Sequence, residues 1–281
     1  MPDMTDFTPS PCRDMMPGNE VLPLTGQTHI LAGNKKRDDM RRIIIMGATS
    51  GIGMEVAKLF IADGWTVGVA GRRGEPLMRL AALAPGRVLT RQIDVTDEHA
   101  ATLLMELVEE CGGMDVYLHS SGIGYNNPAL RPDDELRTVE TNGVGFVRMT
   151  GAAFNYFAAR GSGHVAAITS IAGTKGLGAA PAYSATKRMQ STYLSALKQQ
   201  AAIRGARIAV TDIRPGFVRT GLLGGARYPM QMDAKDVARS IHHAIMSRRR
   251  VAVIDWRYAI LVALWRLIPR PLWERWKINV K

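Results

Sequence analysis

The chain has 281 residues, 46% of them hydrophobic, and a formal net charge of +11 at pH 7. That length and hydrophobic content suffice for one large α/β domain. The basic residues are scattered apart from one run, 248–250, and zinc-finger spacing and RNA-binding aromatic motifs are absent, so we predict no nucleic-acid partner. Two distant cysteines, Cys12 and Cys111, exclude a disulfide framework and favour a reducing, cytoplasmic setting, and we predict no metal site.

Residues 1–39 are rich in Pro, Gly, Asp, Asn and Thr and show little apolar periodicity. We expect a disordered extension there, because such a segment buries too little apolar surface to fold. The segment lacks the basic region and apolar core of a signal peptide. Met40 directly precedes the first predicted strand and is an alternative natural start.

From residue 40 to 255, predicted strands alternate with predicted helices. The strands are 41–46, 65–70, 88–93, 115–119, 165–169, 207–213 and 251–254. The helices are 50–62, 75–83, 97–110, 134–159, 181–204 and 233–247, with Asp97 and Asp233 as expected N-caps. This alternation predicts one α/β domain, a doubly wound, mostly parallel seven-stranded sheet (Rossmann fold) with helices on both faces. Ligands of such sheets bind at the carboxyl ends of the strands.

A glycine-rich turn, GATSGIG at residues 47–53, follows the first strand and opens the first helix. Glycines allow a tight turn and let backbone approach a pyrophosphate, whose charge the helix N-terminus favours. We therefore predict a dinucleotide site, with a turn needed only for helix–strand packing as the alternative. The predicted cofactor-binding residues in this turn are Gly47, Thr49, Ser50, Gly51, Ile52 and Gly53.

Two arginines, Arg72 and Arg73, follow the second strand, where an NAD-preferring fold usually has an acidic residue. A guanidinium makes bidentate, charge-assisted bonds to a 2′-phosphate, so we predict NADP(H) in preference to NAD(H). Solvated loop arginines are the alternative. At the ends of the third and fourth strands we predict further cofactor contacts at Asp94, Val95, Ser121 and Gly122.

These motifs together resemble the single-domain short-chain dehydrogenases/reductases. The resemblance covers residues 41–255 and rests on the glycine turn, Asp94, Ser121-Gly122, Asn142, Ser170, Tyr183-x-x-x-Lys187 and Pro215-Gly216. Met46 stands where the family often has Thr, and His119-Ser120 where it has Asn-Asn. We expect His119 either to brace the central strand or to be satisfied locally. The resemblance implies that Tyr183, Lys187, Pro215, Gly216, Val218 and Thr220 also contact the cofactor.

The spacing of Tyr183 and Lys187 places both side chains on one face of a helix, one turn apart. A nearby ammonium favours the phenolate, so we predict a lowered phenol pKa and Tyr183 as general acid/base. Ser170 is expected to hydrogen-bond a substrate carbonyl. The resemblance implies that Asn142 holds a water that relays protons to the lysine, where Gly143 and Gly145 weaken the helix. The predicted catalytic residues are Asn142, Ser170, Tyr183 and Lys187.

Two segments near the carboxyl terminus bear on the substrate. Residues 221–232 are rich in Gly, Leu and Met, and we expect a mobile lid over an apolar substrate. Residues 256–281 form a basic, tryptophan-rich tail, in which Trp256, Ile260, Ala263, Leu264 and Leu267 share a helical face. The tail fits an interfacial helix on anionic lipid, and equally a helix packed on the sheet edge or at a subunit contact.

The sequence therefore predicts an NADP(H)-dependent oxidoreductase that interconverts a ketone and a secondary alcohol. We expect the substrate to be apolar, such as a 3-oxoacyl or other lipid-like compound. The alternatives are a non-catalytic dinucleotide-binding regulatory protein and an epimerase or dehydratase that uses the same Tyr–Lys pair. The family resemblance further implies a homodimer or homotetramer paired through helices 134–159 and 181–204. A peripheral membrane contact through the tail stays open.

Overall fold

The computed structural model describes residues 41–223 and 228–276. The predicted extension at residues 1–39, the alternative start Met40 and two glycines of the predicted lid, Gly224 and Gly225, lie outside these ranges. The described chain forms a seven-stranded sheet in the order β3-β2-β1-β4-β5-β6-β7, with every neighbouring pair parallel. The predicted doubly wound parallel sheet is confirmed.

The strands are β1 Arg42–Met46, β2 Thr66–Gly71, β3 Val88–Gln92, β4 Val116–His119, β5 Ser162–Ile168, β6 Arg207–Arg214 and β7 Val251–Val253. The α-helices are α1 Gly51–Ala62, α2 Gly74–Ala81, α3 Ala100–Glu110, α4 Pro132–Val139, α5 Phe146–Ala159, α6 Pro181–Ile203, α7 Ala234–Met246, α8 Trp256–Leu267 and α9 Arg270–Arg275. Three short helical segments complete the list, η1 Glu140–Gly145, η2 Ile171–Thr174 and η3 Gly221–Leu223.

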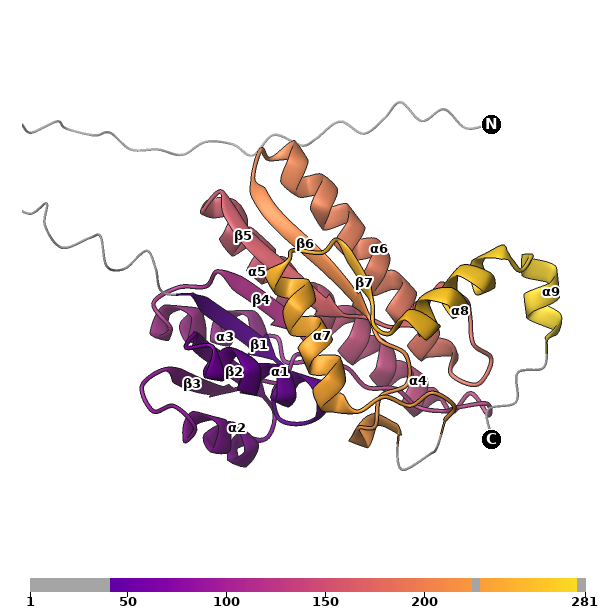
Figure 1. Ribbon diagram of the computed structural model, residues 1–281, viewed down its shortest axis with the longest axis horizontal. Coiled ribbons are helices and arrows are strands. Elements are labelled where there is room, and N and C mark those ends of the chain that lie inside the picture. The colour runs from indigo at the N-terminus through magenta and orange to yellow at the C-terminus, as the bar shows by residue number, and fades with distance from the viewer. Residues whose placement is uncertain (1–40, 224–227, 277–281) are drawn as a thin grey trace, which may run out of the picture. The chain divides into compact units, whose positions relative to one another are not determined.

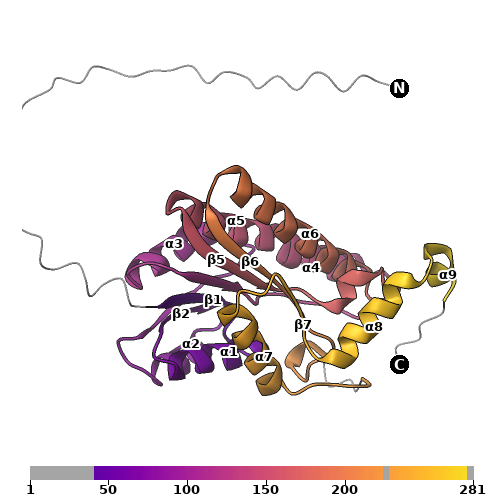
Figure 2. The same ribbon diagram turned by 45° about the horizontal axis from the view of Figure 1, so that its top comes forward.

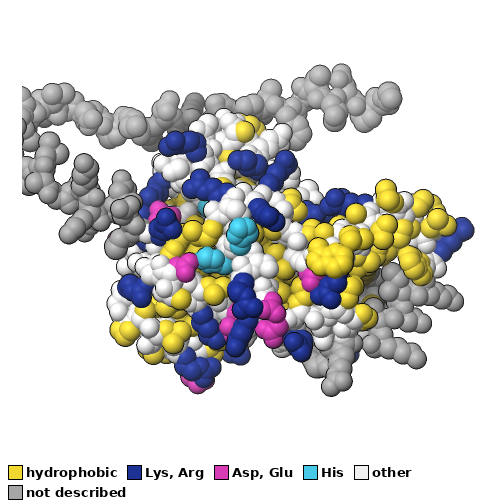
Figure 3. Space-filling model, in the orientation of Figure 1, with side chains coloured by type: hydrophobic (Ala, Val, Ile, Leu, Met, Phe, Trp, Pro, Cys, Tyr) yellow, Lys and Arg dark blue, Asp and Glu magenta, His cyan; other side chains and the backbone are white. Residues whose placement is uncertain are grey.

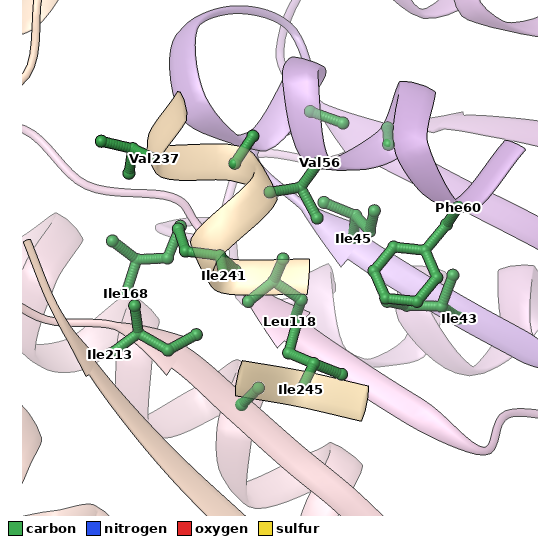
Figure 4. Packing of buried hydrophobic residues seen from close by; sticks show 14 of the residues in the cluster. Ile43, Ile45, Val56, Phe60, Leu118, Ile168, Ile213, Val237, Ile241 and Ile245 are labelled. Carbon is green, nitrogen blue, oxygen red and sulfur yellow. The ribbon is translucent and has the colours of Figure 1, made fainter. Parts of the chain in front are cut away.

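Helices cover both faces of the sheet, with α1, α2 and α7 on one face and α3, α5 and α6 on the other (Figures 1 and 2). The inner strand β1 has apolar side chains on both of its faces, which explains why helices cover both faces of the sheet. Ile43 and Ile45 belong to the core on the α1–α7 face, whereas Ile44 and Met46 belong to the core on the opposite face, and all four are fully buried. Figure 4 shows Ile43 and Ile45 packed beside Val56 and Phe60 of α1, in one cluster with side chains of α7. Burying one such side chain contributes about 1.5–3 kcal/mol to folding.

Two predicted helices have different bounds in the structure. The predicted helix 134–159 is interrupted, since the π-helical segment η1 separates α4 from α5. Gly145 in η1 permits close packing, because a Cβ there would lie 2.9 Å from the Val95 carbonyl oxygen. The prediction that Asp97 caps a helix was wrong. Its carboxylate accepts a hydrogen bond from the His99 amide in a preceding turn, and α3 begins only at Ala100. Asp233 does cap α7, by accepting from the Lys235 amide.

The carboxyl-terminal helix α8 packs on the α1–α7 face of the sheet. Tyr258 is fully buried and Val262 is 3% exposed, and both belong to the core of that face. Trp256 and Ile260, which we predicted to share a face, are 71% and 53% exposed. The predicted shared face of the tail therefore points away from the core. In the ranges that the structure describes, no helix is long and apolar enough to cross a membrane.

Candidate active site

A cavity of about 2010 Å³ opens at the carboxyl ends of the strands. It spans the point where the strand order reverses between β1 and β4, which is where parallel sheets of this kind bind ligands. The structure brings to this one cavity most of the predicted site residues: Gly47, Thr49, Ser50, Gly51, Ile52, Arg72, Arg73, Asp94, Val95, Ser121, Gly122, Ser170, Tyr183, Lys187, Pro215, Gly216, Val218 and Thr220. Gly53 and Asn142 lie behind its wall rather than in it.

The glycine turn has a shape that larger residues cannot adopt. Gly47 has φ +94°, and a Cβ on it would lie 2.5 Å from the Ser121 backbone nitrogen. A Cβ on Gly53 would lie 2.3 Å from the Gly47 carbonyl oxygen, so this glycine lets α1 pack on the turn. The turn thus leaves bare backbone and the N-terminus of α1 at the cavity, an arrangement that suits a pyrophosphate.

The two arginines after β2 lie at the rim of the same turn. Arg73 donates hydrogen bonds to the carbonyl oxygen of Thr49 at 3.2 Å and to its hydroxyl at 3.1 Å. Both arginines are exposed and line the cavity. Asp94 accepts hydrogen bonds from the amide and the hydroxyl of Thr96, which fixes the turn after β3 and leaves its carboxylate at the cavity wall.

The phenol of Tyr183 lies beside the hydroxyl of Ser170. Burial raises the pKa of Tyr183 above its ordinary value of 10.0, and the hydrogen bond with Ser170 opposes that rise. The predicted lowering of this pKa was therefore wrong for the protein as described, because the lost hydration outweighs the hydrogen bond with Ser170. Lys187 Nζ lies 5.7 Å from the centre of the Tyr183 ring. Gly124 makes room for that ring, since a Cβ on Gly124 would lie 2.5 Å from it.

Lys187 is held in a buried polar network. Its ammonium donates to the Ile168 carbonyl at 3.0 Å and to Gln190 Oε1 at 3.1 Å, and its side chain is 5% exposed. Burial lowers the pKa of Lys187 to about 8, while the Asp212 carboxylate opposes the shift. An ammonium has three N–H groups, so two fixed acceptors leave one for the cavity.

Asn142 connects this network to the cavity wall through its position in η1. Its side chain accepts from the Ile123 amide at 2.9 Å and donates to the Ile123 carbonyl at 2.6 Å. Its backbone carbonyl accepts from Gln190 Nε2 at 2.8 Å. A π-helical turn offers carbonyls that an α-helix would have used internally. The predicted helix irregularity is present, but Gln190 and Ile123 occupy the groups that we expected to bind water.

His119 is hydrogen-bonded on its own strand through one ring nitrogen, and its Nε2 is buried without a hydrogen-bond partner among the described residues. Its Nδ1 lies 2.9 Å from the Tyr117 hydroxyl, and its ring packs edge-on against Phe146. Burial lowers the pKa of His119 to about 3, with the Lys187 charge adding to the effect, so the imidazole is neutral at physiological pH. The expectation of a locally satisfied His119 therefore holds for Nδ1 alone, since Nε2 has no partner in the described ranges.

The loop after β6 is fixed by a residue that sequence reasoning missed. The Tyr258 hydroxyl accepts from the Phe217 amide at 3.2 Å and donates to the Met230 carbonyl at 3.0 Å. Gly216 fits against the Tyr258 ring, because a Cβ there would lie 2.2 Å from it. The Phe217 ring stacks on Tyr228 at 4.2 Å, which holds the loop against the predicted lid.

Large side chains of the tail form the opposite wall of the cavity, namely Trp265, Arg270, Trp273, Glu274 and Trp276. Trp273 is 7% exposed and donates from Nε1 to the Gly176 carbonyl at 2.7 Å. Gln190, Tyr258 and Trp273 are the main residues that we did not predict. A signal existed for one of them, since Tyr258, Val262 and Trp265 recur at helical spacing opposite the predicted face of α8.

Comparison with known proteins places the chain in a family. The family model described as short chain dehydrogenase matches residues 41–230. The chain belongs to the short-chain dehydrogenase family. An uncharacterised oxidoreductase of Myxococcus xanthus is 30% identical over 242 residues, which cover 83% of this chain and 95% of that protein. The predictions of the family and of an oxidoreductase are confirmed.

Solved structures agree with this fold. A short-chain dehydrogenase of Sphingobium yanoikuyae in complex with NADPH has a TM-score of 0.70 at 20% identity, covering 86% of this chain and 98% of that one. A short-chain dehydrogenase/reductase of Burkholderia phymatum in complex with NAD has a TM-score of 0.73 at 19% identity, covering 80% and 92%. At these identities the two structures bear on the fold alone.

Proposed function

We propose that this short-chain dehydrogenase is an NADP(H)-dependent oxidoreductase that interconverts a ketone and a secondary alcohol on an apolar substrate. The observation that carries the proposal is that Ser170, Tyr183 and Lys187 line the same cavity as the glycine turn. The glycine turn fits a dinucleotide. Gly47 and Gly53 stand where a Cβ would clash with neighbouring backbone, and α1 presents its N-terminus beside them. A bound nicotinamide supplies or accepts the hydride at the carbonyl carbon.

Tyr183 and Ser170 serve the oxygen of the substrate. In the reduction direction, Tyr183 gives its phenolic proton to the carbonyl oxygen as the carbon is reduced, which leaves a phenolate. The Ser170 hydroxyl already bonds the phenol, and in that place it can also bond the substrate oxygen and stabilise its developing charge. The phenolate must then regain a proton before the next turnover.

Lys187 stabilises that phenolate, and the hydrogen-bond partners of its ammonium set the direction of the N–H that remains. Because the Ile168 carbonyl and Gln190 fix the ammonium, its remaining N–H is directed at the cavity instead of rotating freely. Gln190 in turn bonds the Asn142 carbonyl, which ties the lysine to η1. We therefore assign Gln190 as a positioning residue that acts through Lys187, and Asn142 as the residue that anchors both Gln190 and the loop at Ile123.

The cofactor preference rests on Arg72 and Arg73. Arg73 is held against Thr49 at the edge of the glycine turn, and both guanidinium groups are exposed to the cavity. A 2′-phosphate there meets two cations, whereas a bare 2′-hydroxyl gains little from them. The two structural neighbours carry NADPH in one case and NAD in the other, so the arginines alone support NADP(H).

The substrate class follows from the wall opposite the cofactor residues. Leu222, Tyr228, Trp265 and Trp273 line the cavity there, and they suit an apolar body such as a 3-oxoacyl or other lipid-like chain. The intact Ser170–Tyr183–Lys187 group disfavours a non-catalytic binding protein. An epimerase or dehydratase remains the second enzymatic candidate, since the same Tyr–Lys pair serves it.

We further propose that two copies pair through α4, η1 and α6. These elements expose apolar side chains at Leu136, Val139, Val144 and Met189, between 38% and 67% exposed. Such residues are expected at a subunit interface. Light scattering coupled to size-exclusion chromatography should give a mass of at least two chains, and Val144→Asp should shift it to one.

NADPH oxidation across a panel of ketones, with identification of the alcohol product, tests the proposed function. We expect turnover of apolar ketones and a higher kcat/KM with NADPH than with NADH. A regulatory protein would bind NADPH without consuming it, and an epimerase or dehydratase would convert substrate with no net NADPH oxidation. A clear preference for NADH would refute the role of the arginines.

A further inference from the structure

The outer face of α8 and α9 is apolar and has no partner in the part of the chain that the structure describes. Trp256, Ile260, Leu264 and Leu267 form a stripe along α8 and are between 53% and 77% exposed. Leu272 on α9 is 60% exposed. Figure 3 shows hydrophobic side chains gathered over α8 and α9. The inner face of the same two helices lines the active-site cavity through Trp265, Trp273 and Trp276.

Basic residues flank this stripe. With 3.6 residues per turn, Arg257 lies at one edge of the α8 stripe and Arg266 at the other. Residues 256–276 hold four arginines and one acidic residue, Glu274. Glu274 pairs with Arg270, and Asp255, just before α8, pairs with Arg257. An apolar stripe between basic edges is typical of a helix that lies in the interface of an anionic membrane.

A second cavity, of about 510 Å³, adjoins α8 on the side of Arg266. Four cations line it, Lys175, Arg188, Arg214 and Arg266, and no acidic residue does among those described. Lys175 donates to the Ile268 carbonyl, and Arg214 pairs with Asp212. The side chains of Arg188 and Arg266 make no ion pair or hydrogen bond with another described residue.

An unpartnered hydroxyl adds a second indication of a ligand. Thr174 lines this basic cavity, and its Oγ1 is buried without a hydrogen-bond partner in the described ranges. A buried hydroxyl of this kind normally has a partner. Two unpaired guanidinium groups, an ammonium and a free hydroxyl are the groups that bind a phosphate. A phosphate could come from a lipid headgroup or from a soluble ion, and the apolar stripe beside the cavity favours the lipid.

We propose that α8 and α9 dock on an anionic phospholipid surface, with a headgroup phosphate in the basic cavity and the apolar stripe among the upper acyl chains. A second copy of the chain fits the stripe less well. A symmetric pair would bring Arg266 of each copy toward the basic edge of the other, and Arg266 has no acidic partner among the described residues, unlike Arg257 with Asp255. The proposal deepens the proposed function, because docking brings the α9 rim of the active-site cavity to a source of lipid-like carbonyl substrates.

Co-sedimentation of the full chain with vesicles tests the docking. Vesicles of phosphatidylcholine alone should pellet little protein, and vesicles containing phosphatidylglycerol should pellet most of it. The double variant Ile260→Glu with Leu264→Glu should bind at least about tenfold more weakly. Arg266→Ala should weaken binding by about fivefold. Ile203→Glu, which changes an exposed apolar residue of α6, and Arg239→Ala, which changes an exposed arginine of α7, should bind as the unmodified chain does.

Three results would overturn the proposal. The first is equal pelleting with both vesicle types or equal loss with the control variants. The second is thermal stabilisation by millimolar inorganic phosphate, lost in Arg266→Ala, in a chain that binds no vesicles, since the basic cavity would then take a soluble ion. The third is a change of oligomeric mass in the stripe variant, which would make a second copy the occupant.

The binding readout separates this proposal from the proposed function. Tyr183→Phe should still pellet with phosphatidylglycerol vesicles, because docking requires no turnover. The stripe variant should still reduce a water-soluble ketone, since Ile260 and Leu264 lie outside the active-site cavity. A failed ketone assay with retained vesicle binding would refute the reaction alone.

Discussion

The two walls of the active-site cavity differ in composition, since one is largely backbone and the other is largely aromatic side chains. Residues 47–52 and 71–73, here called the amino-terminal wall, are largely backbone shaped by glycines with short polar side chains and two arginines. The carboxyl-terminal wall consists of large aromatic side chains from α8 and α9, chiefly Trp265, Trp273 and Trp276. The first suits a dinucleotide, and the second suits an apolar substrate. Changes in the two walls should therefore affect different kinetic constants.

The largest effect that separates the walls is expected from Arg72→Ala combined with Arg73→Ala. Loss of charge-assisted bonds to a 2′-phosphate should raise KM for NADPH by about 10–100-fold. KM for NADH and for the ketone should change little. Steady-state kinetics with both cofactors measures this, with Arg79→Ala on the outer surface of α2 as the matched control. Equal losses with NADPH and NADH would contradict the assignment of the arginines to the 2′-phosphate.

Trp273→Phe tests the other wall. This substitution keeps an aromatic ring but removes the indole N–H that bonds the Gly176 carbonyl. Because that carbonyl is left without its donor, the wall should loosen, and KM for the ketone should rise by about fivefold. KM for NADPH should stay constant. A change in KM for NADPH with no change in KM for the ketone would contradict the assignment of the carboxyl-terminal wall to substrate binding.

Gln190→Met changes neither wall but acts on Lys187, and it should have the smallest effect. The substitution removes the acceptor that stabilises the Lys187 ammonium, so the pKa of Lys187, about 8 with Gln190 in place, should fall. The protonated lysine is the active form, and activity is lost as the pH rises through this pKa. The alkaline limb of the pH profile of kcat/KM should therefore move to lower pH, by less than about one unit.

The control for this change is Gln199→Met, an exposed position of α6. Its pH profile should match that of the unmodified chain. If Gln190→Met lowers kcat/KM equally at every pH, Gln190 has only a structural part, and its assignment as a positioning residue of Lys187 is refuted.

The two walls also differ in how far the sequence predicts them. Gly47 and Gly53 belong to a short motif whose spacing dictates backbone shape, so the amino-terminal wall could be read from seven consecutive residues. Tyr258 and Trp273 act through contacts with Gly216 and Gly176, which lie far away along the chain. No local pattern specifies such partners, and only the packed structure shows them.

The same reasoning explains the errors at the catalytic group. The Tyr183–Lys187 spacing predicts a helix face, and α6 has it. The spacing cannot give the depth of burial, which determines the sign of the pKa shift on Tyr183. Nor does it predict that Gln190 bonds the Asn142 carbonyl, because that contact depends on the π-helical turn in a different segment.

The most direct test of the account is Tyr183→Phe, measured for both turnover and cofactor binding. Loss of the acid/base group should lower kcat/KM for ketone reduction by about 10²–10⁴-fold. Fluorescence titration should give a Kd for NADPH close to that of the unmodified chain, since the ring that fills the space beside Gly124 is kept. Undiminished ketone reduction by Tyr183→Phe, with NADPH bound normally, would contradict the proposed mechanism.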